Sequence, residues 1–137
     1  NYYLKSWKDS EIQLNSRRVD SLNSLVNEKC KIVNRGSSTI IGSELTNYIE
    51  MVSGWELRNR CDLLILSKKF EYSDYVCGLN FVKDIANISE ENNHHPRIIF
   101  EYSMVIVNWW THSINGLHRN DFVMAAKTDE CWKFYSA

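Results

Sequence analysis

The spacing of apolar and polar residues predicts a regular series of elements after residue 40. Apolar residues recur every three or four positions in three segments, which predicts helices at 44–53, 74–88 and 119–135. Runs or alternations of apolar residues predict strands at 55–60, 63–70, 98–102 and 104–111. In the last of these, Val105, Val107 and Trp109 share one face. The pattern indicates an α+β fold, with a four-stranded antiparallel sheet covered on one face by three helices.

Residues at the ends of these segments support the assignment. Ser43 and Ser73 each precede a predicted helix, and a serine hydroxyl can accept a hydrogen bond from the first turn. Gly54 follows the first helix. The polar segment 59–62 suits a hairpin, and a tight turn is expected near Ser103.

The helix predicted at 74–88 carries two apolar stripes about a third of a turn apart. Their members are Tyr75, Leu79, Val82 and Ala86 in one stripe, and Phe81, Ile85 and Ile88 in the other. One stripe can cover the sheet, whereas the other requires a further helix or a second subunit. We therefore predict a homo-oligomer.

The first 39 residues differ in composition from the rest. Residues 1–40 hold seven Lys or Arg and four Asp or Glu, with many Ser and Asn. A short helical pattern (Val19, Leu22, Leu25 and Val26) precedes a linker-like stretch at 34–38. We predict an N-terminal extension at 1–39, partly helical or disordered, and a compact domain at 40–137. Because the sequence begins at Asn1 rather than methionine, we expect that a leader or other preceding segment has been removed.

Composition narrows the class of protein. The 137 residues have a net charge of −1, which gives no electrostatic case for binding nucleic acid or a membrane. No apolar run approaches the ~18 residues of a membrane span. The four cysteines are far apart without CxxC spacing, which is typical of reduced thiols in an intracellular protein. A cytoplasmic location is expected. The alternative is an organelle, if the basic N-terminus is a processed targeting segment, but its four acidic residues argue against that.

Three of the four histidines lie close together in the sequence. His94, His95 and Pro96 are consecutive, His112 follows Thr111, and Asp121 completes a span of 28 residues. Imidazole titrates near neutral pH, so such a cluster indicates proton transfer or metal binding.

Three other interpretations compete with proton transfer. A zinc site is disfavoured, because adjacent histidines diverge in an extended segment and Asp121 is a single acidic partner. A nucleophilic triad is disfavoured, because nothing around Cys77 or Cys131 resembles a nucleophile elbow. The histidines could also simply cap a loop. Two of them beside a proline, with a third at a strand end, favour a catalytic role over that structural one.

Several motifs together resemble the signature of the pterin-4a-carbinolamine dehydratases. These are the segment EENNHHP at 90–96, Tyr102, the pattern VxVxWxTH at 105–112, Gly116-Leu117, and Asp121. The resemblance extends upstream. GWEL at 54–57 resembles the first strand of the family, and the aromatic segment 70–75 resembles the segment that leads into its central helix. Lys29-Cys30 resembles the start of some members. The resemblance covers about residues 40–135 and leaves the first 30 uncovered.

The resemblance implies the fold described above, assembled into homodimers or homotetramers. It also implies an enzyme, a 4a-hydroxytetrahydrobiopterin dehydratase or hydro-lyase, that acts without cofactor or metal in recycling of tetrahydrobiopterin. The substrate would be 4a-hydroxytetrahydropterin, the product would be quinonoid dihydropterin, and histidines would supply acid/base catalysis. An alternative comes from members that act as dimerisation cofactors of a homeodomain transcription factor. A further alternative is that the protein is an inactive homologue that supports another pterin enzyme.

Residue by residue, the resemblance implies that His95 and His112 are acid and base, and that His94 lines the pocket and positions the pterin ring. The residues expected to bind substrate are Glu90, Asn93, Pro96, Trp55, Trp110, Thr111, Ser113 and Asp121. Three of these have a structural alternative: Glu90 as an exposed residue at a helix end, Trp55 as a core aromatic, and Asp121 as a first-turn acid that caps a helix. For Asp121 the structural role is favoured.

The chain departs from the family pattern at three positions. His118 occupies a place where Ser or Thr is usual, so we interpret it as a substituted helix cap rather than a catalytic residue. Ser113 replaces an acid of some members, and Trp110 is bulkier than the small residue of others. Both changes affect the expected pocket rim and the preferred pterin side chain.

Overall fold

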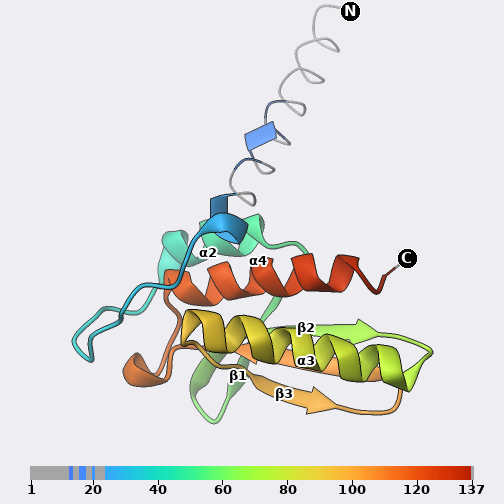
Figure 1. Ribbon diagram of the computed structural model, residues 1–137. Coiled ribbons are helices and arrows are strands. Elements are labelled where there is room, and N and C mark those ends of the chain that lie inside the picture. The colour runs from blue at the N-terminus through green and yellow to red at the C-terminus, as the bar shows by residue number, and fades with distance from the viewer. Residues whose placement is uncertain (1–12, 14–15, 18–19, 21–23, 137) are drawn as a thin grey trace, which may run out of the picture.

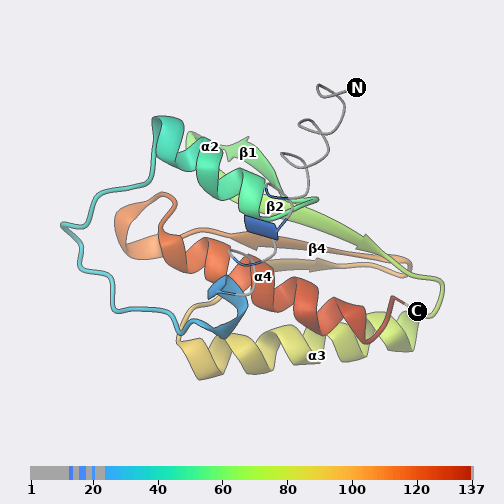
Figure 2. The same cartoon turned by 90° about the horizontal axis from the view of Figure 1, so that it is seen from above.

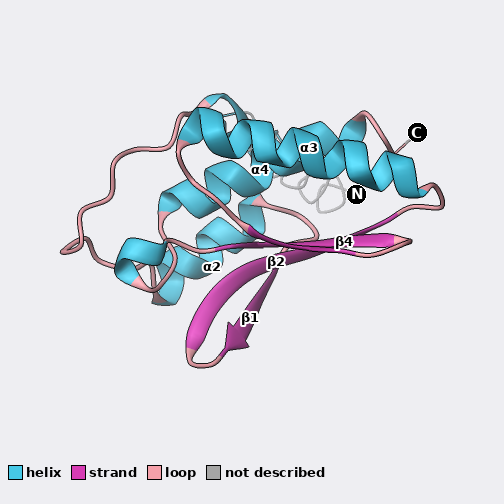
Figure 3. Cartoon of the chain, turned by 60° about the horizontal axis from the view of Figure 1, so that its bottom comes forward, coloured by secondary structure: helices cyan, strands magenta, loops and turns pink. Residues whose placement is uncertain are grey.

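The sheet consists of four antiparallel strands in the order β1-β2-β4-β3. The computed structural model describes residues 13, 16, 17, 20 and 24–136. The elements are α2 (Gly42–Met51), β1 (Glu56–Arg60), β2 (Leu63–Glu71), α3 (Tyr75–Asn92), β3 (Arg97–Phe100), β4 (Met104–Trp109), the short 3₁₀ helix η1 (His112–Ile114) and α4 (Arg119–Lys133). Helices α2, α3 and α4 lie on one side of the sheet (Figures 1 and 3). The predicted α+β architecture is confirmed.

The core forms where the sheet meets α3 and α4. Val105, Val107 and Trp109 of β4 are fully buried, as their alternation predicted. Phe81 and Ile85 of α3 are also fully buried against them. These side chains fix the central strand beneath the two helices, and β4 leads directly into the segment that carries His112.

The apolar stripe of α3 that begins at Tyr75 remains partly open to solvent. Tyr75 and Leu79 are 46% and 42% exposed, and Val76, which belongs to neither predicted stripe, is 57% exposed. The ring of Tyr75 stacks on Phe100 of β3 at a centroid distance of 4.8 Å. The oligomer that this stripe suggested stays a prediction.

Two predicted helix caps are wrong. Asp74, not Ser73, caps α3, and its Oδ1 accepts a hydrogen bond from the backbone N of Val76 at 3.0 Å. Helix α2 has no side-chain cap and begins at Gly42, one residue before Ser43. Gly42 has φ of 64°, a conformation that glycine adopts without the strain of a side chain, so the chain turns into the helix earlier than predicted.

Helix α3 extends four residues beyond its predicted end at 88. The added turn is polar, and two of its side chains bond back along the helix: Ser89 Oγ donates to the Ile85 carbonyl at 2.6 Å and Asn92 Nδ2 to the Ile88 carbonyl at 2.9 Å. The helix ends at Asn93, which adopts the left-handed conformation with φ of 48°. This extension places the end of α3 directly beside His94.

The chain before α2 contacts the rest of the domain. Leu25 is fully buried in the core, and the Val26 carbonyl accepts a hydrogen bond from Lys127 Nζ at 2.7 Å. The backbone N of Ile40 donates to the Leu117 carbonyl at 2.8 Å. Val19 and Leu22 of the predicted helical pattern lie outside the described residues. The domain boundary at residue 40 stays a prediction.

In the described part of the chain, no helix combines the length and the apolar character needed to cross a bilayer.

Candidate functional site

His94, His95 and His112 line one pocket of about 480 Å³. Pockets of roughly 300–1,000 Å³ are typical of small-molecule sites. Two histidines come from the loop that follows α3, and the third opens η1 just after β4. The other lining residues are Cys30, Lys31, Ile32, Val33, Asn92, Asn93, Thr111, Ser113 and Asn120. Two segments of the chain thus bring the three imidazoles together.

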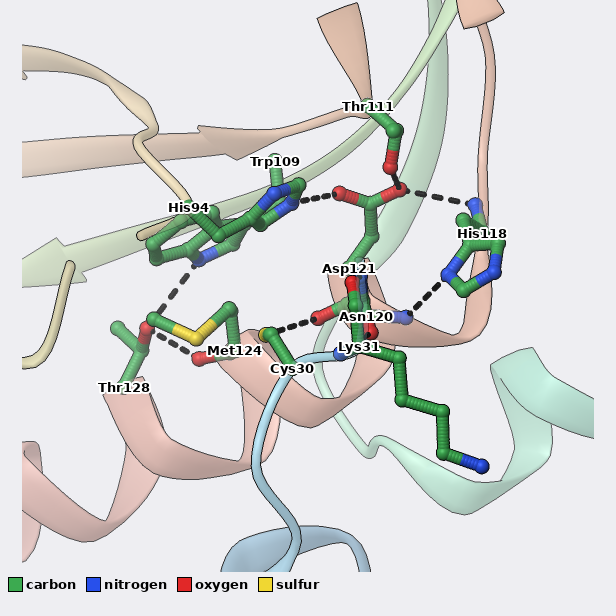
Figure 4. Close-up of polar contacts among 10 residues, drawn as sticks. All are labelled: Cys30, Lys31, His94, Trp109, Thr111, His118, Asn120, Asp121, Met124 and Thr128. Carbon is green, nitrogen blue, oxygen red and sulfur yellow. Dashed lines mark hydrogen bonds and ion pairs between the residues drawn. The ribbon is translucent and has the colours of Figure 1, made fainter. Parts of the chain in front are cut away.

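Asp121 is the centre of a buried hydrogen-bond network beneath the pocket (Figure 4). Its side chain is completely buried, and Oδ1 lies 2.6 Å from His94 Nε2. Oδ2 accepts hydrogen bonds from Thr111 Oγ1 at 2.8 Å and from the backbone N of His118 at 2.9 Å. The second of these is half of a capping box at the start of α4. Asp121 therefore has the structural role favoured for it and also contacts a histidine of the pocket.

The orientation of His94 is fixed from two sides. A carboxylate only accepts hydrogen bonds, so the contact with Asp121 assigns the proton to Nε2 and leaves Nδ1 as the nitrogen that can accept one. The imidazole also lies parallel to the Trp109 indole, with ring centroids 5.7 Å apart. Its side chain is only 11% exposed. Such a histidine suits positioning, because its ring is held both by the Asp121 carboxylate and by the Trp109 indole.

His95 and His112 differ from His94 because both are exposed. His95 Nε2 lies 3.1 Å from Oε1 of Glu90, and both of these side chains are more than half exposed. The His112 ring stacks on Trp110 at a centroid distance of 4.5 Å. Glu90 and Trp110 thus contact the pocket histidines without lining the pocket themselves. The two exposed imidazoles are accessible to a bound molecule.

Some of the other predicted substrate-binding residues line the pocket and others do not. Asn93, Thr111 and Ser113 line the pocket, whereas Pro96, which immediately precedes β3, is not among the lining residues. Trp55 is not among the lining residues and is buried in the core beside Phe70.

Trp55 instead belongs to a second polar cluster. Its Nε1 donates to Asp129 Oδ2 at 2.9 Å, and Lys68 Nζ contacts the other oxygen at 2.8 Å. Burial raises the pKa of Asp129, and the hydrogen bond from Lys68 acts in the opposite direction. This arrangement matches the core-aromatic alternative for Trp55.

Sequence reasoning did not identify the N-terminal wall of the pocket. Cys30, Lys31, Ile32 and Val33 belong to the predicted extension, yet they line the pocket together with Asn120 of α4. The signal available was the resemblance of Lys29-Cys30 to the start of some family members. Burial raises the pKa of the Cys30 thiol to about 12, so this cysteine is a neutral wall residue and not a nucleophile.

The fourth histidine caps α4, as predicted. His118 Nδ1 accepts a hydrogen bond from the backbone N of Asn120 at 3.1 Å, which requires an unprotonated Nδ1. Burial lowers the pKa of His118, although the Asp121 carboxylate opposes that shift. The unfolded chain therefore takes up this proton at a higher pH than the folded chain does. The stabilising contribution is complete above the ordinary histidine pKa of ~6.5 and is lost as the pH falls below it.

We expect His118→Asn to reduce the dependence of stability on pH. Asparagine is an equally good cap and does not titrate, so the free energy of unfolding at pH 7.5 should change by less than about 1 kcal/mol. Between pH 7.5 and 5.5 the variant should lose less stability than the parent, as measured by urea denaturation followed by tryptophan fluorescence. Equal losses in the two proteins would show that His118 does not contribute to this dependence.

In the described residues, no group of three or more His, Cys, Asp or Glu side chains is arranged to hold a metal ion.

Comparison with known proteins agrees with this geometry. Residues 39–131 match the family model described as pterin 4 alpha carbinolamine dehydratase. A transcriptional coactivator/pterin dehydratase from Brucella melitensis has a similar structure, with a TM-score of 0.62 and 26% identity over 69% of this chain and 98% of that one. A pterin dehydratase-like protein identified as a RuBisCO assembly factor in the alpha-carboxysome shares the fold, with a TM-score of 0.50 and 24% identity over 57% of this chain and 88% of that one. The chain belongs to the pterin-4a-carbinolamine dehydratase family.

Proposed function

We propose that this protein dehydrates 4a-hydroxytetrahydropterin to quinonoid dihydropterin and water. The observation that carries the proposal is the meeting of His94, His95 and His112 at one pocket in a chain of this family. Among the described residues, the other lining side chains are mostly small and polar, with a short apolar stretch at residues 32 and 33. The volume of about 480 Å³ suits a bicyclic heterocycle with a short side chain.

The reaction requires two proton transfers. The C4a–O bond breaks, and because hydroxide is a poor leaving group, its oxygen must gain a proton as it departs as water. The N5–H proton must pass to a base so that the C4a=N5 double bond can form. Imidazole groups serve well in both steps near neutral pH, and each can contribute about 10²–10⁴-fold to the rate. No oxidant or reductant is consumed, so the reaction needs no redox cofactor.

We assign the acid and the base to His95 and His112. Both side chains are exposed at the pocket, so each can exchange its proton with water between turnovers. Glu90 is placed to orient His95, and Trp110 supports the ring of His112. His94, held by Asp121 and Trp109, orients the pterin ring and offers Nδ1 as an acceptor.

The direct test is the decay of a 4a-hydroxytetrahydropterin, generated in place by a pterin-dependent hydroxylase and followed by stopped-flow absorbance. We expect the decay rate to rise in proportion to the concentration of the protein. An equal concentration of heat-unfolded protein should leave the uncatalysed rate unchanged. An absence of acceleration over pH 6–8 would refute the proposed activity.

An interaction role is the second candidate, and the exposed apolar residues Tyr75, Val76 and Leu79 of α3 favour it. Exposed apolar residues at helical spacing suit a partner helix or a second copy of the chain. This role does not require pterin turnover. A protein that neither binds pterins nor accelerates the decay, and yet forms complexes through α3, would belong to this class.

A further inference from the structure

A short segment before α2 closes one side of the pocket. We name residues 28–33 the strap. It runs past the C-terminal end of α3 and the start of α4 before the chain swings out toward α2 (Figure 2). The strap lies outside the part of the chain that matches the family model, which begins at residue 39.

Asn120 of α4 clamps the strap through a reciprocal pair of hydrogen bonds (Figure 4). The backbone N of Lys31 donates to Asn120 Oδ1 at 3.0 Å, and Asn120 Nδ2 donates to the Lys31 carbonyl at 2.7 Å. Asn120 is only 4% exposed and immediately precedes Asp121. The strap is thus attached to the residue next to the one that holds His94.

Two further contacts fix the strap on the N-terminal side of this clamp. The backbone N of Cys30 donates to Asn92 Oδ1 at the end of α3, at 3.3 Å. Arg119 donates to both carboxylate oxygens of Glu28, at distances of 2.7–3.0 Å. The hydrogen bond from Arg119 lowers the pKa of Glu28, so this pair remains ionised at neutral pH. The strap therefore bridges α3 and α4 at the ends nearest the histidines.

The strap supplies the aliphatic part of the pocket. Among the described lining residues, Ile32 and Val33 are the only aliphatic ones, and the rest are polar apart from the thiol Cys30. Ile32 is 96% exposed and follows directly after the clamped residue Lys31. An isoleucine at the rim of a polar pocket can gain burial when a ligand with an apolar group binds there.

We propose that the strap, and Ile32 above all, selects pterins that carry a carbon side chain at C6. This inference rests on the proposed function. In the pterin ring, C6 is bonded to N5, so a substituent at C6 lies one atom from the position where the histidines act. Among the described lining residues, the aliphatic surface that such a substituent can contact belongs to Ile32 and Val33 of the strap. Full burial of one methylene is equivalent to roughly fourfold in affinity, so a partly buried propyl chain should give about a three- to tenfold preference.

The test compares two substrates in two variants of the full chain. The substrates are 4a-hydroxytetrahydropterins with a propyl group at C6 and with no side chain. Ile32→Ala removes the aliphatic contact, and Ile41→Ala is the matched control, because Ile41 is also exposed, at 72%, and does not line the pocket. We expect Ile32→Ala to reduce the ratio of the two kcat/KM values by about three- to tenfold. The effect should come from a higher KM for the propyl substrate. Ile41→Ala should preserve the ratio.

Two outcomes distinguish a failure of the strap proposal from a failure of the proposed function. If the parent protein turns over both substrates and the two variants keep the same ratio, the strap does not select the side chain, and the dehydratase activity stands. If the parent neither turns over the substrates nor binds the matching 7,8-dihydropterins, as read by tryptophan fluorescence, both proposals fail. A selective loss of kcat/KM for the propyl substrate in Ile32→Ala supports the proposed role of the strap. Ile32→Asp should increase that loss further.

Discussion

Replacement of Asp121 with alanine is expected to lower the free energy of unfolding by about 3–5 kcal/mol, the cost of removing one partner from a buried hydrogen-bonded charged cluster. The side chain is completely buried, and three donors depend on it: His94 Nε2, Thr111 Oγ1 and the His118 backbone N. The variant leaves all three without this acceptor and also breaks the capping box of α4. Urea denaturation followed by tryptophan fluorescence measures the loss.

Asp121→Asn is the control that separates stability from positioning. Its amide keeps an oxygen that can accept from Thr111 and from the His118 backbone, so we expect a loss of only about 1–2 kcal/mol. Its NH₂ group now faces His94 and favours the tautomer without a proton on Nε2. Turnover should fall at least tenfold in a variant that is folded, and the pH profile should change. Normal turnover with an unchanged profile would show that Asp121 is purely structural.

The elements of this fold could be predicted because burial imposes a simple period on the sequence. Val105, Val107 and Trp109 alternate toward the helices and are all fully buried. The ends of helices are decided by individual hydrogen bonds, which periodicity does not report. Ser73 and Asp74 are adjacent potential caps, and only the geometry shows that the Asp74 carboxylate reaches the Val76 amide.

The strap could not be predicted for a different reason. Its contacts run through backbone groups and single polar side chains, such as Asn120, and these produce no recurring pattern in the sequence. Leu25 is fully buried, but it stands in a polar, basic stretch that suggested an extension. Trp55 shows the opposite case, because its residue type and position suggested a pterin wall, whereas the indole donates to Asp129 in the core.

The histidine cluster was predicted from spacing and its roles from the family resemblance, whereas the environments of the individual rings could be read only from the structure. Adjacent in sequence, His94 and His95 have opposite environments: one is stacked on Trp109 and bonded to a buried carboxylate, and the other is exposed beside Glu90. The neighbouring side chains diverge, as expected for an extended segment, so one is fixed and one is accessible. This difference is the physical basis for assigning proton transfer to His95 and His112.

Replacing His95 or His112 singly with alanine should lower kcat at least tenfold, with losses of about 10²–10⁴-fold if each acts as a full acid or base. Both residues are exposed, so the free energy of unfolding should change by less than about 1 kcal/mol, and the loss cannot be attributed to misfolding. Because the two groups would serve one reaction step, the double variant should lose less than the product of the single effects.

His118→Asn supplies the matched control for these two variants. It removes the fourth histidine, which caps α4 and does not line the pocket, so turnover should remain within about twofold of the parent. Full turnover in both His95→Ala and His112→Ala would refute their assignment as acid and base. A large loss of turnover in only one of these two variants would assign one proton transfer to that histidine and the other proton transfer to water. His95→Ala and His112→Ala, with His118→Asn as their control, thus determine how much of the proton transfer depends on the exposed pair.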